Sequence, residues 1–378
     1  MSQTAFHGGK SFEAIGEDFQ DLQRAESIIN ADVLDAWFDP SPRVIERLQR
    51  FLPFLARTSP PVYASGPRTA IAQRRRISEE CILMGGGSSH LIFTCLPRLC
   101  QGRARAMILD PMYGEYRHVL ENLIGIETIT FDLHADECFR IDTDRLIRKV
   151  LAKEVDVVVL VNPNSPTGQY WSRRETIWFL DSIPQSTLVI IDETYIEYCG
   201  SNESIETECE RRPNLIVLKS MSKVYALSGM RVGYMVASSE TVRKVAEWMP
   251  PWAVSLPSQV AAVEALGDEE YYQRRYAETH NLRQELACAL TRSVGLRAYP
   301  SSTNLVLVEA QTSAQAILEG MQRSGVFVRN CDSMGSRLAD RFLRIAVKNR
   351  EQNERIAQAL GTAVCDQFKE SGNEEILG

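Results

Sequence analysis

Six short apolar runs, separated by longer segments of mixed polarity, constrain the fold of this chain more than any other feature. The runs are rich in Val, Ile and Leu and do not alternate with polar residues, which is typical of strands covered on both faces. Such strands, alternating with helical segments, predict a mostly parallel sheet with helices on both sides. The runs are CILMGG (81–86), RAMILDP (105–111), VDVVVLVNP (155–163), STLVIIDE (186–193), NLIVLKS (214–220) and RVGYMVA (231–237).

The C-terminal third has a different pattern. A long helical stretch, interrupted near Gly267, is followed by the apolar runs STNLVLVEA, GVFVRN and FLRIAV. We therefore predict an α/β fold, with a three-layer large domain at 46–265 and a smaller α+β domain at 266–378. Residues 1–45 are less regular, and we expect them to pack as an arm on the smaller domain.

Composition argues against several classes of partner. The net charge of −7 argues against nucleic acid as the main ligand. The cysteines have no CxxC spacing and the N-terminus has no apolar signal segment, which favours reduced thiols in a cytoplasmic protein. The histidines lack metal-ligand spacing, and no apolar run reaches the roughly 18 residues of a membrane span. We expect no metal and no membrane partner.

The chemically unusual residues follow the predicted strands. In a parallel sheet, ligands bind beyond the carboxyl ends of the strands. The segment GGGSSH (85–90) opens a helix there, where glycines allow close backbone approach and helix N–H groups bind anions. Tyr113 follows the second run. Asp192 ends the fourth run, where a carboxylate is unfavourable unless a cation pairs with it.

Lys223 lies among small residues in SMSKVYALSGMRVGY (220–234), shortly before Arg231. A lysine nucleophile, an anion cradle, an aromatic face and a buried carboxylate are the parts of a pyridoxal 5′-phosphate (PLP) site. The lysine forms a Schiff base with the aldehyde, and the carboxylate keeps the pyridine nitrogen protonated so that the ring acts as an electron sink. Backbone N–H groups, hydroxyls and an arginine hold the phosphate. The sequence therefore predicts PLP as the cofactor.

In combination, SMSKVYALSGMRVGY, NPNSPTG (162–168) and IDETYIEY (191–198) resemble fold-type I PLP-dependent enzymes of the class I/II aminotransferase family. The sequence is most similar to histidinol-phosphate aminotransferases and to threonine-phosphate decarboxylases. The resemblance extends from about residue 28 to about residue 350. It implies the PLP-dependent transferase fold and an L-amino acid as substrate.

The resemblance also implies roles for single residues around the cofactor. Lys223 would form the Schiff base and later move the Cα proton. Asp192 would pair with the pyridine nitrogen, Tyr195 would hydrogen-bond the ring hydroxyl, and Tyr113 would stack on the ring. The implied phosphate ligands are Ser88, Ser89, Ser220, Ser222 and Arg231.

Three further positions match residues at the substrate and subunit boundaries of the family. Tyr63 matches a tyrosine that reaches the phosphate of the neighbouring subunit, which implies a homodimer with shared active sites. Arg344 matches the arginine that binds the substrate α-carboxylate. Arg329 matches a position that contacts the distal acidic group of the substrate in some relatives.

The sequence departs from the family pattern in two places. Ser165 replaces the asparagine that usually precedes Pro-Thr-Gly, and Asn164 lies one position earlier, so the contact to the ring hydroxyl comes from either residue or from neither. The segment INADVLDAWFDPSP (29–42) is longer than its counterpart and brings Asp32 and Asp35. It is either a capped turn or an acidic lid that would suit a cationic substrate side chain.

Transamination of an L-amino acid is the leading functional interpretation. The acidic segment and the altered asparagine motivate an alternative, which is cyclodehydration or elimination on a hydroxylated, possibly guanidino-bearing, amino acid in specialised metabolism. Decarboxylation is a third reaction. A regulator or scaffold without catalysis is a fourth reading, and the intact set of Lys223, Asp192 and Arg231 argues against it.

Overall fold

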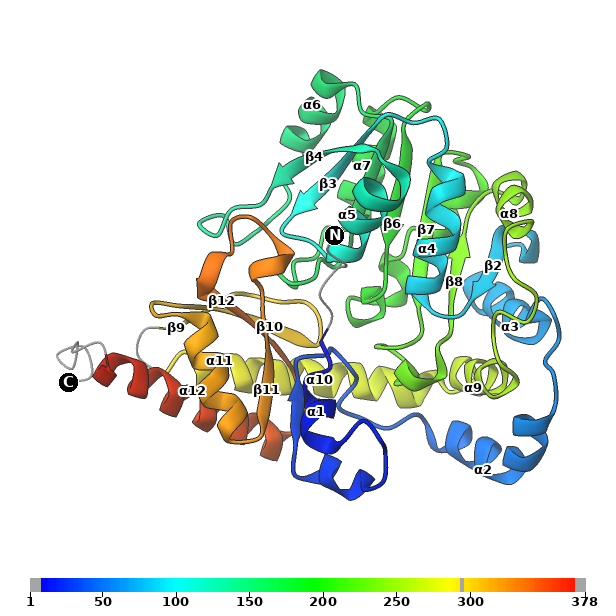
Figure 1. The fold of residues 1–378 in the computed structure, drawn as a ribbon. Coiled ribbons are helices and arrows are strands. Elements are labelled where there is room, and N and C mark those ends of the chain that lie inside the picture. Colours follow the sequence, from blue (N-terminus) through cyan, green and yellow to red (C-terminus); the bar gives the residue numbers. More distant parts are fainter. Residues whose placement is uncertain (1–7, 293–295, 371–378) are drawn as a thin grey trace.

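A seven-stranded sheet forms the centre of the computed structural model, which describes residues 8–292 and 296–370 (Figure 1). The strands lie in the order β2 (Ile82–Gly85), β8 (Gly233–Val236), β7 (Leu215–Ser220), β6 (Leu188–Asp192), β5 (Val157–Val161), β3 (Arg105–Asp110) and β4 (Glu127–Asp132). Neighbours pair in parallel except at β8, which is antiparallel to β2 and to β7. The predicted α/β fold with a mostly parallel sheet is confirmed.

Burial explains why the strand sequences do not alternate. Every residue of β5, β6 and β7 is buried, so both faces of these strands require apolar side chains. β4 was not predicted from the sequence. It reads ETITFD and lies at the edge of the sheet, where most of its side chains are only partly buried.

A second sheet of five strands is built mainly from the C-terminal third. Its order is β1 (Ile29–Ala31), β11 (Val326–Asn330), β12 (Phe342–Ala346), β10 (Leu305–Ala310) and β9 (Leu296–Ala298). β1 pairs in parallel with β11, which joins the N-terminal segment to this sheet. The domain limits at residues 45 and 265 stay predictions.

Helices surround both sheets (Figure 1). The long helical pattern of the sequence forms α9 and α10, and Gly267 caps the end of α9. Among the described residues, no helix combines the length and the apolar character that a bilayer span needs. The helices are α1 (Ser11–Ile15), α2 (Pro42–Arg57), α3 (Ser65–Arg75), α4 (Ser88–Leu99), α5 (Gly114–His118), α6 (Thr143–Lys153), α7 (Arg173–Ser182), α8 (Ser239–Ala246), α9 (Leu256–Leu266), α10 (Glu269–Leu290), α11 (Ala314–Arg323) and α12 (Arg350–Glu370).

Candidate active site

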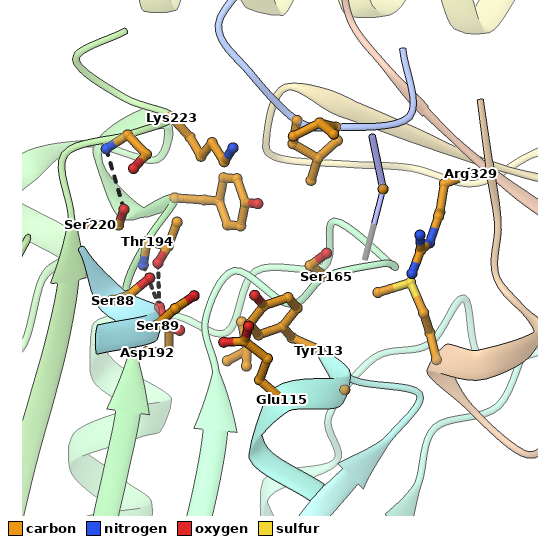
Figure 2. A pocket seen from close by; sticks show the side chains of 18 of the residues that line it. Ser88, Ser89, Tyr113, Glu115, Ser165, Asp192, Thr194, Ser220, Lys223 and Arg329 are labelled. Atoms are coloured by element: carbon orange, nitrogen blue, oxygen red, sulfur yellow. Dashed lines mark hydrogen bonds between the residues drawn. The ribbon is translucent and has the colours of Figure 1, made fainter. Parts of the chain in front are cut away.

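A cavity of about 240 Å³ lies between the carboxyl ends of the parallel strands and the five-stranded sheet (Figure 2). The structure brings most of the predicted site residues together in its lining. Asp35, Asn164 and Tyr63 lie outside the lining. The predicted residues that line it are Asp32, Ser88, Ser89, Tyr113, Ser165, Asp192, Tyr195, Ser220, Ser222, Lys223, Arg231, Arg329 and Arg344.

One end of the cavity is suited to an anion. The first N–H groups of α4 have no partners within the helix, so they point a partial positive charge at this end. Gly87 precedes α4 with a φ of +90°, and a Cβ there would lie 2.8 Å from Nη2 of Arg231. Arg231 donates from Nη1 to the carbonyl oxygen of Ser228 over 2.9 Å. Glycine at position 87 therefore allows the guanidinium to lie against the helix start.

Asp192 lies at the end of β6 and is only 3% exposed. It accepts hydrogen bonds from the hydroxyl of Tyr116 (2.8 Å), from Oγ1 of Thr194 (2.6 Å) and from the backbone N–H of Thr194 (2.9 Å). Burial raises its pKa, although these donors oppose the shift. No side chain of the described residues forms an ion pair with it. A cation in the cavity would therefore stabilise the ionised form of this buried carboxylate.

Lys223 faces the same cavity and contacts a carboxylate. Its Nζ lies 2.7 Å from Oδ1 of Asp35 and 3.4 Å from Oγ of Ser228. Burial lowers the pKa of Lys223, and the Asp35 carboxylate opposes this shift. A lowered pKa favours the neutral amine, which is the nucleophilic form of a lysine.

The structure separates Asn164 from Ser165. The amide nitrogen of Asn164 donates to the carbonyl oxygen of Pro111 (3.1 Å) and to Oγ1 of Thr167 (3.0 Å). Ser165 lines the cavity, and its Oγ accepts a hydrogen bond from Nη1 of Arg344 over 3.0 Å. Of the two residues, Ser165 is the one that lines the cavity, whereas Oδ1 of Asn164 is buried without a hydrogen-bond partner among the described residues.

Two buried arginines lie opposite each other at the other end of the cavity. Arg329 on β11 and Arg344 on β12 are direct cross-strand partners, so their side chains share one face of the sheet. Like charges in this arrangement repel, and both side chains are less than 10% exposed. Arg344 donates from Nη2 to the backbone oxygen of Asp32 over 2.8 Å, and it has no ion pair with any described carboxylate. This end also favours an anion.

Asp32 partly balances the arginine pair. Its Oδ1 lies 3.8 Å from Nη1 of Arg329, and its Oδ2 accepts a hydrogen bond from the backbone N–H of Gly9 over 3.0 Å. A Cβ at Gly8 would lie 2.6 Å from the same Oδ2. The segment before α1 therefore lies directly against Asp32, and Gly8 itself lines the cavity.

Tyr63 lies away from the cavity of its own chain. Its side chain is 75% exposed, in the segment that leads into α3. This placement does not bring Tyr63 to the site within one chain. A contribution to the site would have to come from a second copy.

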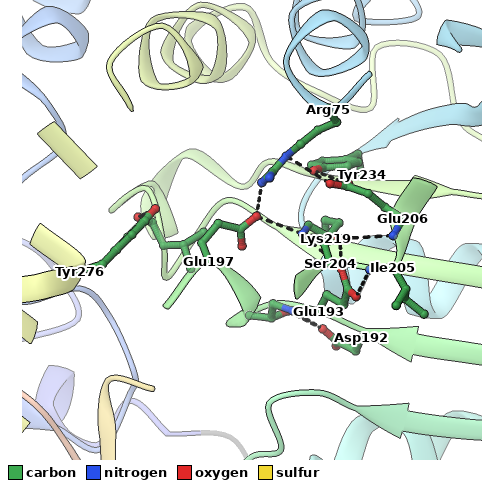
Figure 3. A network of polar contacts seen from close by, with 12 residues as sticks. Arg75, Asp192, Glu193, Glu197, Ser204, Ile205, Glu206, Lys219, Tyr234 and Tyr276 are labelled. Atoms are coloured by element: carbon green, nitrogen blue, oxygen red, sulfur yellow. Dashed lines mark hydrogen bonds and ion pairs between the residues drawn. The ribbon is translucent and has the colours of Figure 1, made fainter. Parts of the chain in front are cut away.

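A buried network of ion pairs lies beside the ends of β6 and β7 (Figure 3). Glu193 directly follows Asp192, and Lys219 directly precedes Ser220. Because successive strand side chains face opposite sides, these ion pairs help to fix which face carries Asp192 and Ser220. Lys219 lies 3.0 Å from Glu197 and 3.3 Å from Glu193. The charged members are Arg75, Glu193, Glu197, Glu206 and Lys219.

Sequence reasoning missed several residues around the site. Tyr116 and Thr194 hold Asp192, and Lys348 lies close to Asp35 with its Nζ 3.5 Å from the backbone oxygen of that residue. Tyr116 had a detectable signal, because it follows Tyr113 by one helical turn in MYGEY. Lys348 had none, since the sequence does not show which distant lysine approaches Asp35.

The residues present fit PLP. The buried carboxylate of Asp192 suits a protonated pyridine nitrogen, and Arg231 with the start of α4 suits a phosphate. The close approach at Gly87 leaves no room for a side chain at this end of the cavity. Lys223 supplies a partly buried amine in the same cavity.

Comparison with known proteins agrees with this reading. The sequence matches the family of class I and II aminotransferases over residues 32–360. It is 32% identical over 306 residues to a histidinol-phosphate aminotransferase of Bacillus velezensis, covering 80% of this chain and 82% of that protein. The crystal structure of histidinol-phosphate aminotransferase from Sinorhizobium meliloti, in complex with PLP, matches with a TM-score of 0.83 and 24% identity over 96% of both chains. L-threonine-O-3-phosphate decarboxylase from Porphyromonas gingivalis matches with a TM-score of 0.74 and 22% identity, over 89% of this chain and 99% of that one.

Proposed function

The chain belongs to the class I and II aminotransferase family and is a PLP-dependent enzyme, and on that premise we propose that it transfers the amino group of an L-amino acid at Lys223. The observation that carries this proposal is the cavity itself. It unites a partly buried amine at Lys223, a buried carboxylate at Asp192 and an anion site at Arg231.

Each of these residues has a separate task in the proposed reaction. Bound PLP supplies an electron sink that stabilises negative charge at the substrate Cα. Lys223 would hold the cofactor through its aldehyde and would move the proton at the substrate Cα. Asp192, oriented by Tyr116 and Thr194, would keep the pyridine nitrogen protonated. Arg231 and the first turn of α4 would hold the phosphate.

We propose Ser165 as the side chain that replaces the usual asparagine near the ring hydroxyl, with Tyr195 as the second donor. Ser165 lines the cavity, whereas Asn164 lies outside the lining and its amide nitrogen donates to Pro111 and Thr167. Because Ser165 also accepts from Arg344, it would connect the cofactor side of the cavity to the substrate side.

The substrate α-carboxylate is assigned to Arg344. This guanidinium is buried, it lines the cavity, and no described carboxylate pairs with it. A buried arginine without a counter-ion is unfavourable until an anion binds. Planar, bidentate recognition of a carboxylate is the task to which arginine is best suited.

The substrate side chain has two candidate readings at this end of the cavity. In the first, Asp32 or Asp35 faces a cationic side chain, and the N-terminal segment closes over it. In the second, Arg329 binds a phosphate group of the substrate, as the names of the relatives suggest. The opposed pair of Arg329 and Arg344 favours the second reading, because a dianion would relieve their repulsion.

We also propose a homodimer with shared active sites. The exposed hydroxyl of Tyr63 lies outside the cavity of its own chain and is free to reach a phosphate in a second copy. Arg231 is likewise exposed in the single chain, at the same anion-binding end of the cavity.

A product analysis tests the reaction and the substrate together. The purified protein, reconstituted with PLP, is incubated with a panel of L-amino acids and with histidinol phosphate, each with and without 2-oxoglutarate. Mass spectrometry of the products separates transamination, which requires the oxo acid, from decarboxylation or elimination, which does not. Formation of glutamate together with an oxo acid, or with a ketone in the case of histidinol phosphate, supports the proposal. Carbon dioxide or water loss without the oxo acid contradicts it.

Three variants then distinguish the two candidate side chains. If the substrate is cationic, Asp32→Asn and Asp35→Asn both raise its KM, and Asp32→Asn leaves the PLP spectrum unchanged. If histidinol phosphate is the efficient substrate, Arg329→Gln raises its KM instead, and the cationic reading fails. Both sets are measured with the same substrate panel.

A further inference from the structure

We propose that Lys348 is a positioning residue of this active site, which acts on Lys223 through Asp35. Lys348 holds the backbone of residue 35 in place, and its charge offsets the effect of the Asp35 carboxylate on the catalytic amine. The inference rests on the assignment of Lys223 as the lysine that binds PLP.

The first observation is the direct contact between Asp35 and Lys223. Their ion pair measures 2.7 Å, and the two residues are 188 positions apart in the sequence. Asp35 therefore reaches the amine from a segment unrelated to the strand ends that build the rest of the cofactor site. A carboxylate this close to an amine stabilises the protonated form and would, acting alone, oppose formation of the nucleophile.

The second observation is a buried lysine behind that carboxylate. Lys348 is only 7% exposed, and its Nζ approaches the backbone oxygen of Asp35 at a long 3.5 Å. The described residues place no carboxylate within ion-pair distance of it. Burying an ammonium group without a close counter-ion is unfavourable, which a purely structural residue could avoid with an uncharged side chain.

The third observation is how firmly Lys348 is held. It lies in the turn between β12 and α12, where its backbone N–H donates to Oδ1 of Asn353 over 2.9 Å. Nδ2 of Asn353 returns a hydrogen bond to the carbonyl oxygen of Lys348 over 2.8 Å. The side chain therefore starts from a fixed point and extends toward residue 35.

The surrounding charges define the direction of each effect. Lys223 is also approached by Arg344 and Arg231, and both lower its pKa, whereas Asp35 raises it. Burial lowers the pKa of Lys348 to about 8, with Asp35 opposing the shift and Lys223 adding to it.

Two further titratable groups near Lys223, Asp35 and Tyr195, do not change the direction of these effects. Lys223 and Lys348 both lower the pKa of Asp35, against the effect of burial. Burial raises the pKa of Tyr195, and the Asp35 carboxylate acts in the same direction, so this phenol stays protonated.

These contacts form a cluster of one carboxylate and two amines. Because the interaction of two charges is reciprocal, a protonated Lys348 lowers the pKa of Lys223 just as Lys223 lowers that of Lys348. Asp35 can then orient the amine of Lys223, while the charge of Lys348 limits the rise in the pKa of Lys223 that Asp35 causes. Removal of the charge of Lys348 or of Asp35 should therefore shift the titration of Lys223, in a direction that depends on the sign of the charge removed.

The test is a pH titration of the visible absorbance band of the PLP-bound protein, which reports protonation at the nitrogen of Lys223. Lys348→Met removes a cation and should raise the apparent pKa, whereas Asp35→Asn removes an anion and should lower it. We expect shifts of roughly half a unit or more, as for charges separated by a few ångströms in a partly buried site. Lys348→Gln also removes the charge but keeps a polar side chain, and it serves if the Met variant folds poorly.

Matched variants separate this role from a structural one. Lys348→Arg keeps the charge and should titrate like wild type. Lys244→Met removes an exposed lysine that pairs with Glu240 over 2.7 Å on the surface of α8, and should shift nothing. An unchanged titration in both Lys348→Met and Lys348→Gln, or a shift in the same direction as Asp35→Asn, would overturn the proposal.

A second readout keeps this proposal apart from the assignment on which it rests. Borohydride reduction followed by peptide mapping shows which lysine carries the cofactor. An adduct on a lysine other than Lys223 defeats the proposed function. An adduct on Lys223 together with unshifted titrations defeats only the role of Lys348. Competitive acylation of Lys223 in the cofactor-free full-length chain, followed against pH by mass spectrometry, measures the pKa of Lys223 directly. It should show a raised pKa in Lys348→Met and a lowered pKa in Asp35→Asn.

Discussion

Single residues at this site are placed against their own preference for water. Asp192 is buried without an ion pair among the described residues, and Lys223, whose side chain is 18% exposed, lies near two arginines. The sequence could predict both, because an ionisable residue at the end of an apolar run is a local signal. It could not predict the contact of Asp35 with Lys223, which joins positions 188 residues apart and depends on how the N-terminal segment packs.

The raised pKa of Asp192 makes a prediction about stability. The folded chain keeps a proton on this carboxyl at higher pH than the unfolded chain, whose ordinary value is about 3.9. The contribution of Asp192 to the free energy of unfolding therefore falls as the pH rises through the raised pKa. Asp192→Asn should raise the unfolding temperature of the cofactor-free protein at neutral pH, by an amount that shrinks in acid, and should lower kcat by ~10²-fold or more.

Asp156 provides a control of opposite sign. The backbone N–H groups of Ala104 and Arg105 donate to its Oδ2 over 2.8 and 3.0 Å and hold its pKa below the ordinary value. Asp156→Asn should therefore lower the unfolding temperature at neutral pH and spare kcat. Calorimetry across the pH range compares the two variants, and equal signs would refute the electrostatic explanation.

Arg344 makes a prediction about substrate binding. A charge-assisted, bidentate contact to the α-carboxylate is worth about 2–3 kcal/mol, so Arg344→Gln should raise KM by about 30- to 150-fold. Arg344→Lys should restore little, because lysine cannot form the paired contact. Steady-state kinetics with the substrate found by product analysis measures this, and a retained low KM in Arg344→Gln would move the carboxylate to another residue.

Strands of the seven-stranded sheet were predicted where all their side chains are buried, and the edge strand with partly exposed side chains was missed. The runs that became β5, β6 and β7 are buried on both faces, which makes them continuous and easy to recognise. β4 is an edge strand of mixed polarity and was missed. The antiparallel direction of β8 also left no trace in the sequence, since a buried strand has the same composition in either direction.

The turn between β2 and α4 makes a prediction at the scale of an element. Gly87 has a positive φ, and an added Cβ would lie 2.8 Å from the guanidinium of Arg231. Gly102 also has a positive φ, but open space surrounds it. Gly87→Ala and Gly102→Ala should both lose about 1 kcal/mol of stability, and only Gly87→Ala should also weaken PLP binding. Fluorescence titration of the cofactor-free protein with PLP measures this, and equal affinities would exclude the close approach as a functional feature.

At the scale of the whole molecule, Tyr63 makes a prediction about assembly. If it completes the phosphate site of a second copy, Tyr63→Phe should weaken PLP retention by about 1–3 kcal/mol, the range of a lost charge-assisted hydrogen bond. Tyr271→Phe is the control, since its hydroxyl donates to the backbone oxygen of Asp39 outside the cavity. Sedimentation and cofactor release are followed together on dilution. A monomer that keeps full activity would contradict the shared site.

The parallel pairing of β1 with β11 also has a consequence for how the chain is made. Residues 29–31 meet their partner strand at 326–328, and the guanidinium of Arg344 binds the backbone of a residue 312 positions earlier. During synthesis from the N-terminus, this first strand must wait unpaired until nearly the whole chain has left the ribosome. The seven-stranded sheet can assemble well before then, because all its strands lie between 82 and 236. A nascent or truncated chain should therefore complete its cofactor-binding strands early and acquire its substrate-binding end last.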